Sequence, residues 1–132
     1  MITGLDHVPL AAPPGGEQRL RASCAGVLGM AEPPKPPALA ARGGCWFAAG
    51  DRVLHLGIEA GYRPPGKAHP GILVAGIDAF AARLAAHGAR VEGDGARVEG
   101  DGDLPGHRWF FSEAPVGNRL EFLMPKPPRQ CH

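Results

Sequence analysis

Residues 50–74 read GDRVLHLGIEAGYRPPGKAHPGILV and contain two strand-like runs separated by a turn-rich segment. In the first run, residues 52–59, apolar side chains alternate with a set that includes His55. Alternation with a period of two predicts a strand with one packing face and one face that is available for chemistry. After a segment rich in proline and glycine, residues 69–74 repeat the pattern and carry His69. The stretch therefore predicts two strands with histidines on equivalent faces.

The residues before this stretch predict three further strands and a helix. A short alternating run carries His7, and a helix is predicted where apolar residues recur at every fourth position up to Gly29, a usual helix stop. Two short strands and a hairpin turn then lead into the strand with His55. In chain order, these elements are a strand at 4–10, a helix at 17–28, strands at 38–42 and 44–49, a turn at 50–51 and a strand at 52–59. The first half is therefore predicted to be β-α-β-β-β.

The second half repeats this order after the turn-rich segment. Asp78 is a predicted helix N-cap, and Gly88 is the expected residue after the helix end. The predicted elements are a strand at 69–74, a helix at 79–87, and strands at 89–92, 107–112 and 119–124. Two copies of one unit predict an α+β fold made of two βαβββ modules, the first at about 3–60 and the second at about 68–125. We expect a single domain, residues 1–132.

A short tandem repeat interrupts the second module. Residues 89–95 and 96–102 have the same sequence, ARVEGDG. The repeat is too short and too rich in glycine for a solenoid, and it indicates a local duplication that lengthens one loop or hairpin. A functional lid is the alternative, but surface loops accept extra length at small entropic cost. We expect that deletion of one copy leaves the fold intact.

The composition points to a globular protein that acts on small molecules. The 132 residues are 44% apolar and 20% charged, and the net charge of +1 lacks the basic excess that binding to nucleic acid or an anionic membrane requires. No apolar run approaches the roughly 20 residues that span a bilayer, and the first residues do not resemble a secretion signal, so we expect a cytoplasmic protein. The cysteines, without a CxxC pattern, are expected to be buried reduced thiols: Cys24, Cys45 and Cys131.

The two modules carry chemically useful side chains at matching positions. His7 on the first strand of one module corresponds to His69 on the first strand of the other, and His55 on a last strand corresponds to Glu121. Imidazole nitrogens and a carboxylate oxygen are suitable ligands for a divalent metal, and water or substrate oxygens would complete the coordination. Taken singly, a strand histidine is more often a hydrogen-bonded or half-exposed residue. The metal hypothesis therefore depends on the matched positions.

With these residues in place, the chain resembles the vicinal oxygen chelate superfamily, which includes glyoxalase I, methylmalonyl-CoA epimerase, extradiol dioxygenases, and the fosfomycin and bleomycin resistance proteins. The motifs that carry the resemblance are LDHV at 5–8, RVLHLGIE at 52–59, KAHPGILV at 67–74, DLPGHRWFF at 103–111 and GNRLEFL at 117–123. The resemblance implies that the paired modules form a cupped mixed sheet that binds one divalent ion. It also implies the ligands, which would be His7, His55, His69 and Glu121.

The resemblance leaves three functions open. The first is a lyase or isomerase in which the metal binds two neighbouring substrate oxygens, stabilises an enediolate-type intermediate, and Glu121 or a metal-bound water moves a proton. Zinc, nickel, manganese, cobalt or iron could serve. The second is an Fe(II) extradiol-type dioxygenase that uses His7, His69 and Glu121, although His55 would occupy a position that those enzymes keep free. The third is an antibiotic-binding protein without turnover.

The expected partners are a small substrate and a second copy of the chain. Arg119 shares the face of Glu121, and Arg63 lies in the segment before His69, so both are candidate substrate-binding residues. A metal ringed by strands from two modules requires the modules to face each other. Small members of the resembled superfamily are commonly dimers whose sites draw ligands from both chains, which implies a homodimer with shared sites.

Overall fold

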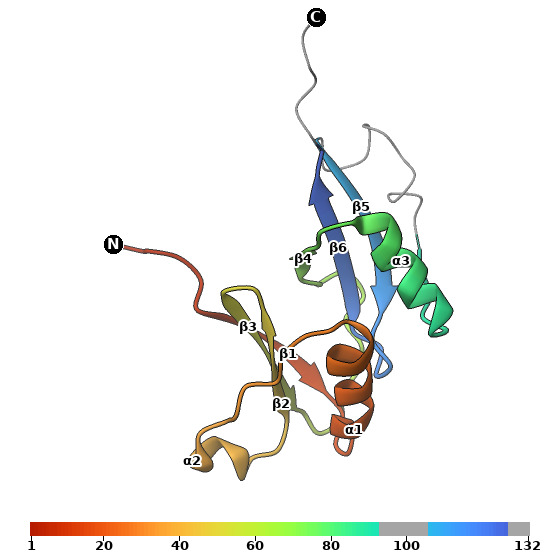
Figure 1. Cartoon of the computed structure of the whole chain (residues 1–132). Helices are drawn as coiled ribbons and strands as arrows, with labels where there is room; N and C mark the ends of the chain where they lie inside the picture. Colours follow the sequence, from red (N-terminus) through yellow and green to blue (C-terminus); the bar gives the residue numbers. More distant parts are fainter. Residues whose placement is uncertain (93–105, 127–132) are drawn as a thin grey trace, which may run out of the picture. The chain divides into compact units, whose positions relative to one another are not determined.

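The computed structural model describes residues 1–92 and 106–126, and most of the tandem repeat lies outside these ranges. The chain forms two compact units (Figure 1). Unit 1 comprises Met1–Ala68 and Glu113–Arg119, and unit 2 comprises His69–Ser112 and Leu120–His132. The elements are β1 (His7–Ala12), α1 (Glu17–Leu20), η1 (Arg21–Val27), α2 (Pro37–Ala40), β2 (Cys45–Ala49), β3 (Arg52–Ile58), β4 (Gly71–Leu73), α3 (Ile77–Ala86), β5 (His107–Glu113) and β6 (Arg119–Pro125).

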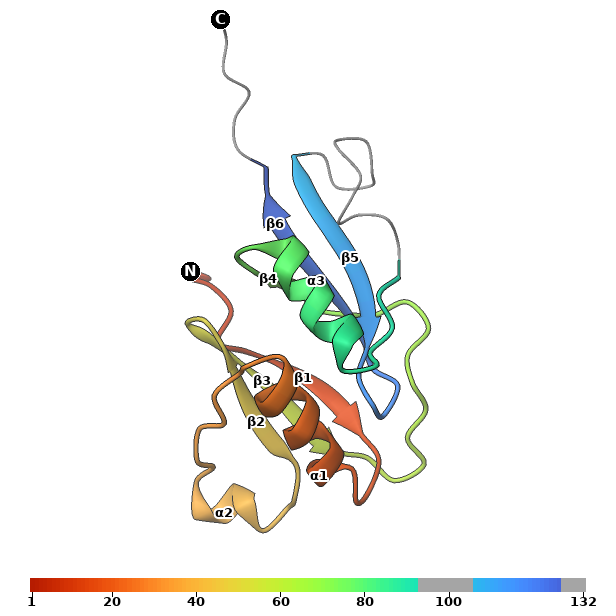
Figure 2. The same cartoon turned by 45° about the vertical axis from the view of Figure 1, so that its right-hand side comes forward.

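Unit 1 is built on a sheet of three strands in the order β1-β3-β2. Strand β3 lies in the middle, parallel to β1 and antiparallel to β2. The alternation predicted for β3 is confirmed, because Leu54 and Leu56 are buried whereas His55 is half-buried. The helix α1, which continues as the wider π-helix η1, lies against this sheet (Figure 2) and contributes the buried side chains of Leu20 and Cys24.

Unit 2 repeats the same strand order, with β6 between β4 and β5. Strand β4 runs parallel to β6, as β1 runs parallel to β3 in unit 1. The helix α3 covers one face of the sheet (Figure 2), and its Phe80 packs edge-on against Phe122 at a ring-centroid distance of 4.9 Å. Leu84 on α3 and Phe110 on β5 are also fully buried in this core. The α+β class and the duplicated architecture are therefore confirmed.

The second strand predicted for each module is not found among the described residues. Residues 38–42 were predicted as a strand, but they overlap α2, which begins at Pro37. Proline fits the first turn of a helix because its fixed φ suits that turn and its missing N–H would have no partner there. In unit 2, the predicted strand at 89–92 contributes a single antiparallel bridge between Glu92 and Phe111. Each described sheet therefore has three strands.

The sequence predicts the C-terminal end of α3 correctly but not its N-terminal end. Gly88, with φ +79°, follows the helix as predicted. At the other end the N-cap is Gly76, whose φ is +62°, so the predicted N-cap role of Asp78 is wrong. The carboxylate of Asp78 instead accepts two hydrogen bonds from the Arg108 guanidinium, at 2.7 and 2.9 Å. This ion pair joins α3 to β5.

The turn between β5 and β6 packs within unit 1. Asn118, which is 3% exposed, donates a hydrogen bond from Nδ2 to the backbone oxygen of Ala11 at 2.9 Å. Gly117, with φ +100°, lies so close to Pro64 that a Cβ atom would come within 2.6 Å of the proline ring. Val116 is buried as well. A late segment of the sequence thus completes the packing of the first unit.

None of the helices among the described residues is long and apolar enough to cross a membrane.

Both cysteines that the structure describes, Cys24 and Cys45, are buried free thiols, as predicted. Burial, followed by the neighbouring Cys45, raises the pKa of Cys24 to about 12. Burial also raises the pKa of Cys45. These thiols are packing groups that stay protonated at neutral pH. Cys131 lies outside the described residues.

Candidate metal and substrate site

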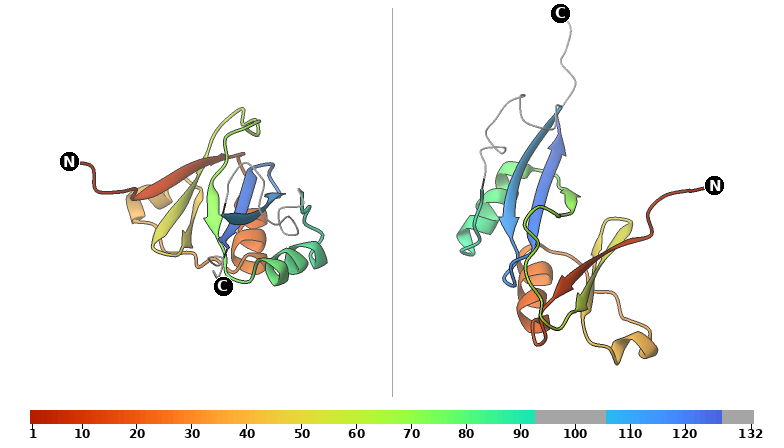
Figure 3. Two further views of the ribbon diagram at one scale, coloured as in Figure 1. Left: turned by 90° about the horizontal axis from the view of Figure 1, so that it is seen from above. Right: turned by 180° about the vertical axis from the view of Figure 1, so that it is seen from behind.

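The open face of unit 1 carries three stacked rings. The imidazole of His55 stacks on the indole of Trp46 at a centroid distance of 4.0 Å and an interplanar angle of 3°. On its other side, His55 stacks on His7 at 4.0 Å and 14°. The register explains the stack, because Trp46 is the direct partner of His55 in the β2–β3 ladder. Figure 3 shows the strands of this sheet beside their helix from above and from behind. The sheet thus brings His7 and His55 together.

Both histidines of unit 1 are suited to donate nitrogen lone pairs. Burial, followed by the neighbouring His7, lowers the pKa of His55 below its ordinary value and favours the neutral ring. The Nδ1 atom of His7 lies 3.1 Å from Oδ2 of Asp6. An ionised carboxylate can only accept a hydrogen bond, so Nδ1 is the donor and Nε2 of His7 keeps its lone pair. A neutral imidazole is the form that binds a metal ion.

Unit 2 brings His69 and Glu121 together by a hydrogen bond. The Nε2 atom of His69 donates to Oε1 of Glu121 at 2.9 Å, and the side chains are only 23% and 17% exposed. The parallel pairing of β4 and β6 sets this contact, because the Glu121 amide donates to the backbone oxygen of Pro70, next to His69 in the chain. The edge of the His69 ring also lies against Phe111, at a centroid distance of 5.1 Å. The predicted pair is therefore close and half-buried.

The separation of these two atoms fits shared binding of a metal ion. Ligand atoms held at about 2.1 Å from an ion and at right angles to each other lie about 3 Å apart. The observed distance between Nε2 and Oε1, 2.9 Å, is already close to this value. A nitrogen and a carboxylate oxygen are also donors that zinc, nickel, manganese, cobalt and iron accept. In the structure this distance is that of a hydrogen bond with the proton on Nε2. With the proton on Nδ1 instead, Nε2 and Oε1 would be two ligand atoms for a divalent metal at nearly the same spacing.

The prediction that all four residues converge on one ion stays a prediction. His7 and His55 belong to unit 1, whereas His69 and Glu121 belong to unit 2. Within the part of the chain that the structure describes, no group of three or more His, Cys, Asp or Glu side chains could hold a metal ion. Each unit supplies one pair.

The two predicted substrate-binding arginines differ in their surroundings. Arg119 begins β6, and it is half-buried like Glu121 while the intervening Leu120 is buried. Arg119 and Glu121 therefore share a face of the strand, as the alternation predicts. Arg63 is exposed in the segment after β3. Their role towards a substrate stays a prediction.

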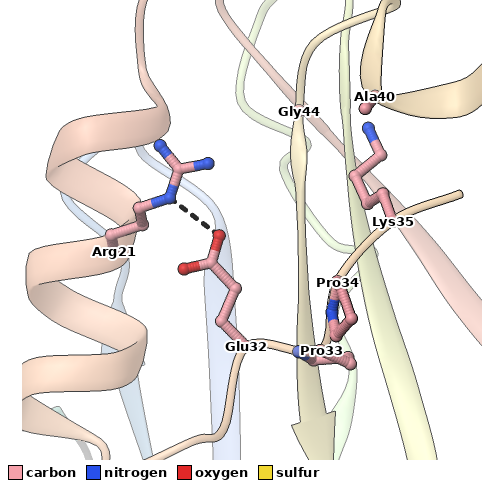
Figure 4. Close-up of a pocket in the computed structure, with 7 residues that line it drawn as sticks. All are labelled: Arg21, Glu32, Pro33, Pro34, Lys35, Ala40 and Gly44. Carbon is pink, nitrogen blue, oxygen red and sulfur yellow. Dashed lines mark hydrogen bonds and ion pairs between the residues drawn. The ribbon is translucent and has the colours of Figure 1, made fainter. Parts of the chain in front are cut away.

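A separate pocket of about 310 Å³ opens on unit 1 (Figure 4). Arg21 and Glu32 form an ion pair at its wall, at 2.7 Å, and Lys35 donates a hydrogen bond to the backbone oxygen of Gly43. The remaining lining residues are Pro33, Pro34, Ala40 and Gly44. The predicted ligands do not line this pocket, and its charged groups are already engaged with one another or with the backbone.

The contact of Trp46 with His55 was not predicted from the sequence. The signal was present in the alternation of β2. Cys45 and Phe47 are buried on the helix side, so Trp46 between them faces the side of His55. In unit 2, Trp109 and Phe111 alternate in the same way with the buried Phe110. Alternation and register together would have found the stack.

The comparisons with known proteins agree with this architecture. The chain is 40% identical to a glyoxalase family protein from Bacillus anthracis, covering 96% of this chain and 98% of that protein with a TM-score of 0.85. A FosX fosfomycin resistance protein variant from Listeria monocytogenes, complexed with Mn(II) and 1S,2S-dihydroxypropylphosphonic acid, matches at 17% identity, 96% and 95% coverage and a TM-score of 0.73. TnmS3, an antibiotic binding protein from a Streptomyces species, matches at 21% identity, 95% and 100% coverage and a TM-score of 0.69.

These matches come from solved structures, and no family model and no curated protein matches the sequence. The two more distant likenesses concern the fold alone. The likeness to the Bacillus anthracis protein extends over nearly the whole of both chains at an identity that establishes kinship. This chain therefore belongs to the glyoxalase family of the vicinal oxygen chelate superfamily.

Proposed function

We propose that the chain is a metal-dependent glyoxalase-like enzyme, a lyase or isomerase that acts on a small substrate with two neighbouring oxygen atoms. The observation that carries the proposal is the contact of 2.9 Å between Nε2 of His69 and Oε1 of Glu121, which has the spacing of two adjacent metal ligands. The proposed ligands are His7, His55, His69 and Glu121. The fold likeness to FosX, which was solved with Mn(II), supports a divalent ion.

The ion would supply Lewis acidity to the substrate oxygens. Glu121 would accept and return a proton on a carbon next to one of these oxygens, because a half-buried carboxylate beside the metal site is placed to reach that carbon. Before a metal binds, His69 orients this carboxylate through the Nε2–H group, and in the loaded site Nε2 would give up this proton and bind the ion. Arg119, two residues before Glu121 on β6, would attract the negative charge that develops on the substrate. Arg63 would attract an anionic group of the substrate.

We propose further that the enzyme is a homodimer in which each site combines the His7 and His55 pair of one chain with the His69 and Glu121 pair of the other. The support is that each described unit holds one pair of ligands and that neither unit gathers three. Two equivalent sites would be related by a two-fold axis. The cytoplasmic location expected from the sequence belongs to this proposal as well.

The first test is the metal content of protein purified without chelators. About one zinc, nickel, cobalt or manganese ion per chain, reduced to a small fraction in His69→Ala and in Glu121→Gln, would support the enzyme proposal. Two other results would replace it. Iron together with oxygen consumption would favour the dioxygenase, and a metal-free chain that binds a small molecule tightly would favour a binding protein.

The second test addresses the shared site. A His7→Ala, His55→Ala chain is mixed with a His69→Ala, Glu121→Ala chain, and the heterodimer is isolated by two affinity tags. Each parent should bind no metal tightly, whereas the heterodimer should recover up to one intact site. Recovery of no site in a properly formed heterodimer, or a metal-loaded monomer in light scattering, would contradict the dimer proposal.

A further inference from the structure

The stack on the open face of unit 1 fixes the plane of the His55 ring. Trp46 on β2 and His7 on β1 lie on either side of it, each with a ring centroid 4.0 Å from that of His55. The outer torsion of a histidine side chain is soft and takes a broad range of values. Two flat neighbours in van der Waals contact narrow this range, because rotation of the imidazole out of the stack would strike one of them. The ring is therefore held before any ligand arrives. For both histidines to bind one ion, His7 would have to leave the stack, because the lone pairs of stacked rings lie in separate parallel planes, so Trp46 is the neighbour that stays against His55 in the loaded site.

Trp46 lies on the face of β2 that points away from the buried core of unit 1. The buried core of β2 is formed by Cys45 and Phe47, which are 1% and 0% exposed, whereas Trp46 is half-buried on the opposite face. The nearly parallel arrangement, with an interplanar angle of 3°, places the indole surface rather than its edge against the imidazole. The surface of an indole is electron-rich and attracts positive charge more strongly than that of phenylalanine.

We propose that Trp46 is a positioning residue for the metal site: it sets the orientation of His55 and stabilises the positive charge that the His55 ring acquires when a divalent cation binds to it. The inference rests on the proposed function. A ring that donates its lone pair to a cation becomes electron-poor, so the attraction to the indole is greater in the metal-bound state than in the metal-free state. Trp46 therefore adds to metal affinity without touching the ion.

The test measures Co²⁺ affinity by titration calorimetry and follows the visible absorption of the bound Co²⁺, which reports the number and geometry of its nitrogen ligands. Trp46→Leu should weaken affinity by about 10- to 100-fold, the usual effect of removing a group that orients a ligand. Trp46→Phe should restore part of this loss, because phenylalanine stacks but attracts positive charge less strongly. The intensity of the absorption bands should change in the same order.

Two controls separate this role from general damage. Phe80→Leu removes an aromatic ring from the helix side of the unit 2 sheet, where Phe80 packs against Phe122, and should leave Co²⁺ affinity within about twofold of the wild type. In a His55→Ala background, Trp46→Leu should have no further effect on affinity, because the indole would have no ligand to orient. Far-ultraviolet circular dichroism and thermal unfolding establish that each variant is folded.

The outcomes are distinguishable. If the wild-type protein binds no divalent metal, the proposed function fails, and this inference fails with it. If the wild-type protein binds Co²⁺ but folded Trp46→Leu binds it equally well, the proposed function stands and the positioning role is overturned. Equal losses from Trp46→Leu with and without His55 would also overturn the role, since they would show that Trp46 acts on the fold rather than through His55.

Discussion

The two units use one strand order but hold their candidate ligands by different forces. In unit 1, His7 and His55 are held by ring stacking that extends to Trp46. In unit 2, His69 and Glu121 are held by a hydrogen bond between a ring nitrogen and a carboxylate. The first arrangement depends mainly on contact between flat rings, with a further hydrogen bond from His7 to the exposed Asp6, and the second depends on a hydrogen bond between two half-buried side chains. The comparison teaches that the two repeats preserve the strand positions of the candidate ligands more strictly than the contacts that hold them.

The largest expected effect is a difference in the stability of the two units when a buried phenylalanine in the core of one of them is truncated. Phe47 in unit 1 and Phe122 in unit 2 are 0% and 1% exposed, and truncation of a buried phenylalanine to alanine costs about 3–5 kcal/mol. Urea unfolding of Phe47→Ala and Phe122→Ala can be followed separately in each unit, with Trp46 as the probe in a Trp109→Phe background and Trp109 as the probe in a Trp46→Phe background. Each truncation should shift the midpoint of its own unit more.

Identical shifts of both probes by either truncation would show that the units unfold as one cooperative body. That result would contradict the view that each unit holds its pair of candidate ligands independently of the other unit. The single tryptophan backgrounds without a truncation provide the reference midpoints, so that the replaced tryptophan does not enter the comparison.

A second pair of variants compares a crowded glycine with an open one. Gly44 in unit 1 has φ +83°, and a Cβ atom there would overlap the backbone oxygen of Leu56. Gly88 in unit 2 has φ +79° but no atom within 4 Å of such a Cβ. Gly88→Ala should cost only the conformational strain of about 1–2 kcal/mol. Gly44→Ala should cost clearly more, because the central strand β3 must also move.

Thermal unfolding of the two alanine variants measures this difference. If both variants lose the same stability, the backbone of β3 can move at Leu56 at little cost. The central strand of unit 1 would then be less rigid than its position suggests. Gly61→Ala is a matched control within unit 1, because its φ is +70° and its surroundings are open.

The smallest expected effect concerns the exposed ion pair between Asp78 and Arg108. The hydrogen bonds from the Arg108 guanidinium hold the pKa of the Asp78 carboxyl below its usual value. The unfolded chain therefore binds the proton at higher pH than the folded chain, and this contribution is present above the usual pKa and lost as the pH falls through the folded value. Asp78→Asn should slightly reduce the loss of stability of unit 2 at acidic pH, which is measured by acid unfolding with Trp109 as the fluorescent probe. An unchanged acid transition in Asp78→Asn would show that solvent screens this pair completely.

The sequence predicts the strands that carry the candidate ligands better than the segments that connect them. Strand β3 alternates clearly, so that the face of His55 follows from Leu54 and Leu56 alone. The faces of Arg119 and Glu121 follow in the same way from Leu120 and Phe122. Periodicity is a strong signal here because each sheet has one face that packs against a helix and one that does not.

The failures have local causes. Residues 38–42 read as a weak strand, but Pro37 and its small neighbours favour the first turn of a helix, and no alternation opposed that choice. The N-cap at Gly76 depends on a left-handed backbone that a sequence pattern does not reveal, and Asp78 was free to bond Arg108 instead. The contact between Trp46 and His55 required the pairing register of two strands, which periodicity alone does not give.

The turn at Glu113–Arg119 has a consequence for the order in which the chain can assemble during its synthesis. Ala11 receives its hydrogen bond from Asn118, which is 107 residues later in the sequence. The strands and helices of unit 1 are made first, but their last packing partners, Val116 and Asn118, are made only after β4, α3 and β5. A nascent chain must therefore keep unit 1 unfinished until most of unit 2 exists, and a gene cut after Ala68 would yield a first half that lacks these partners.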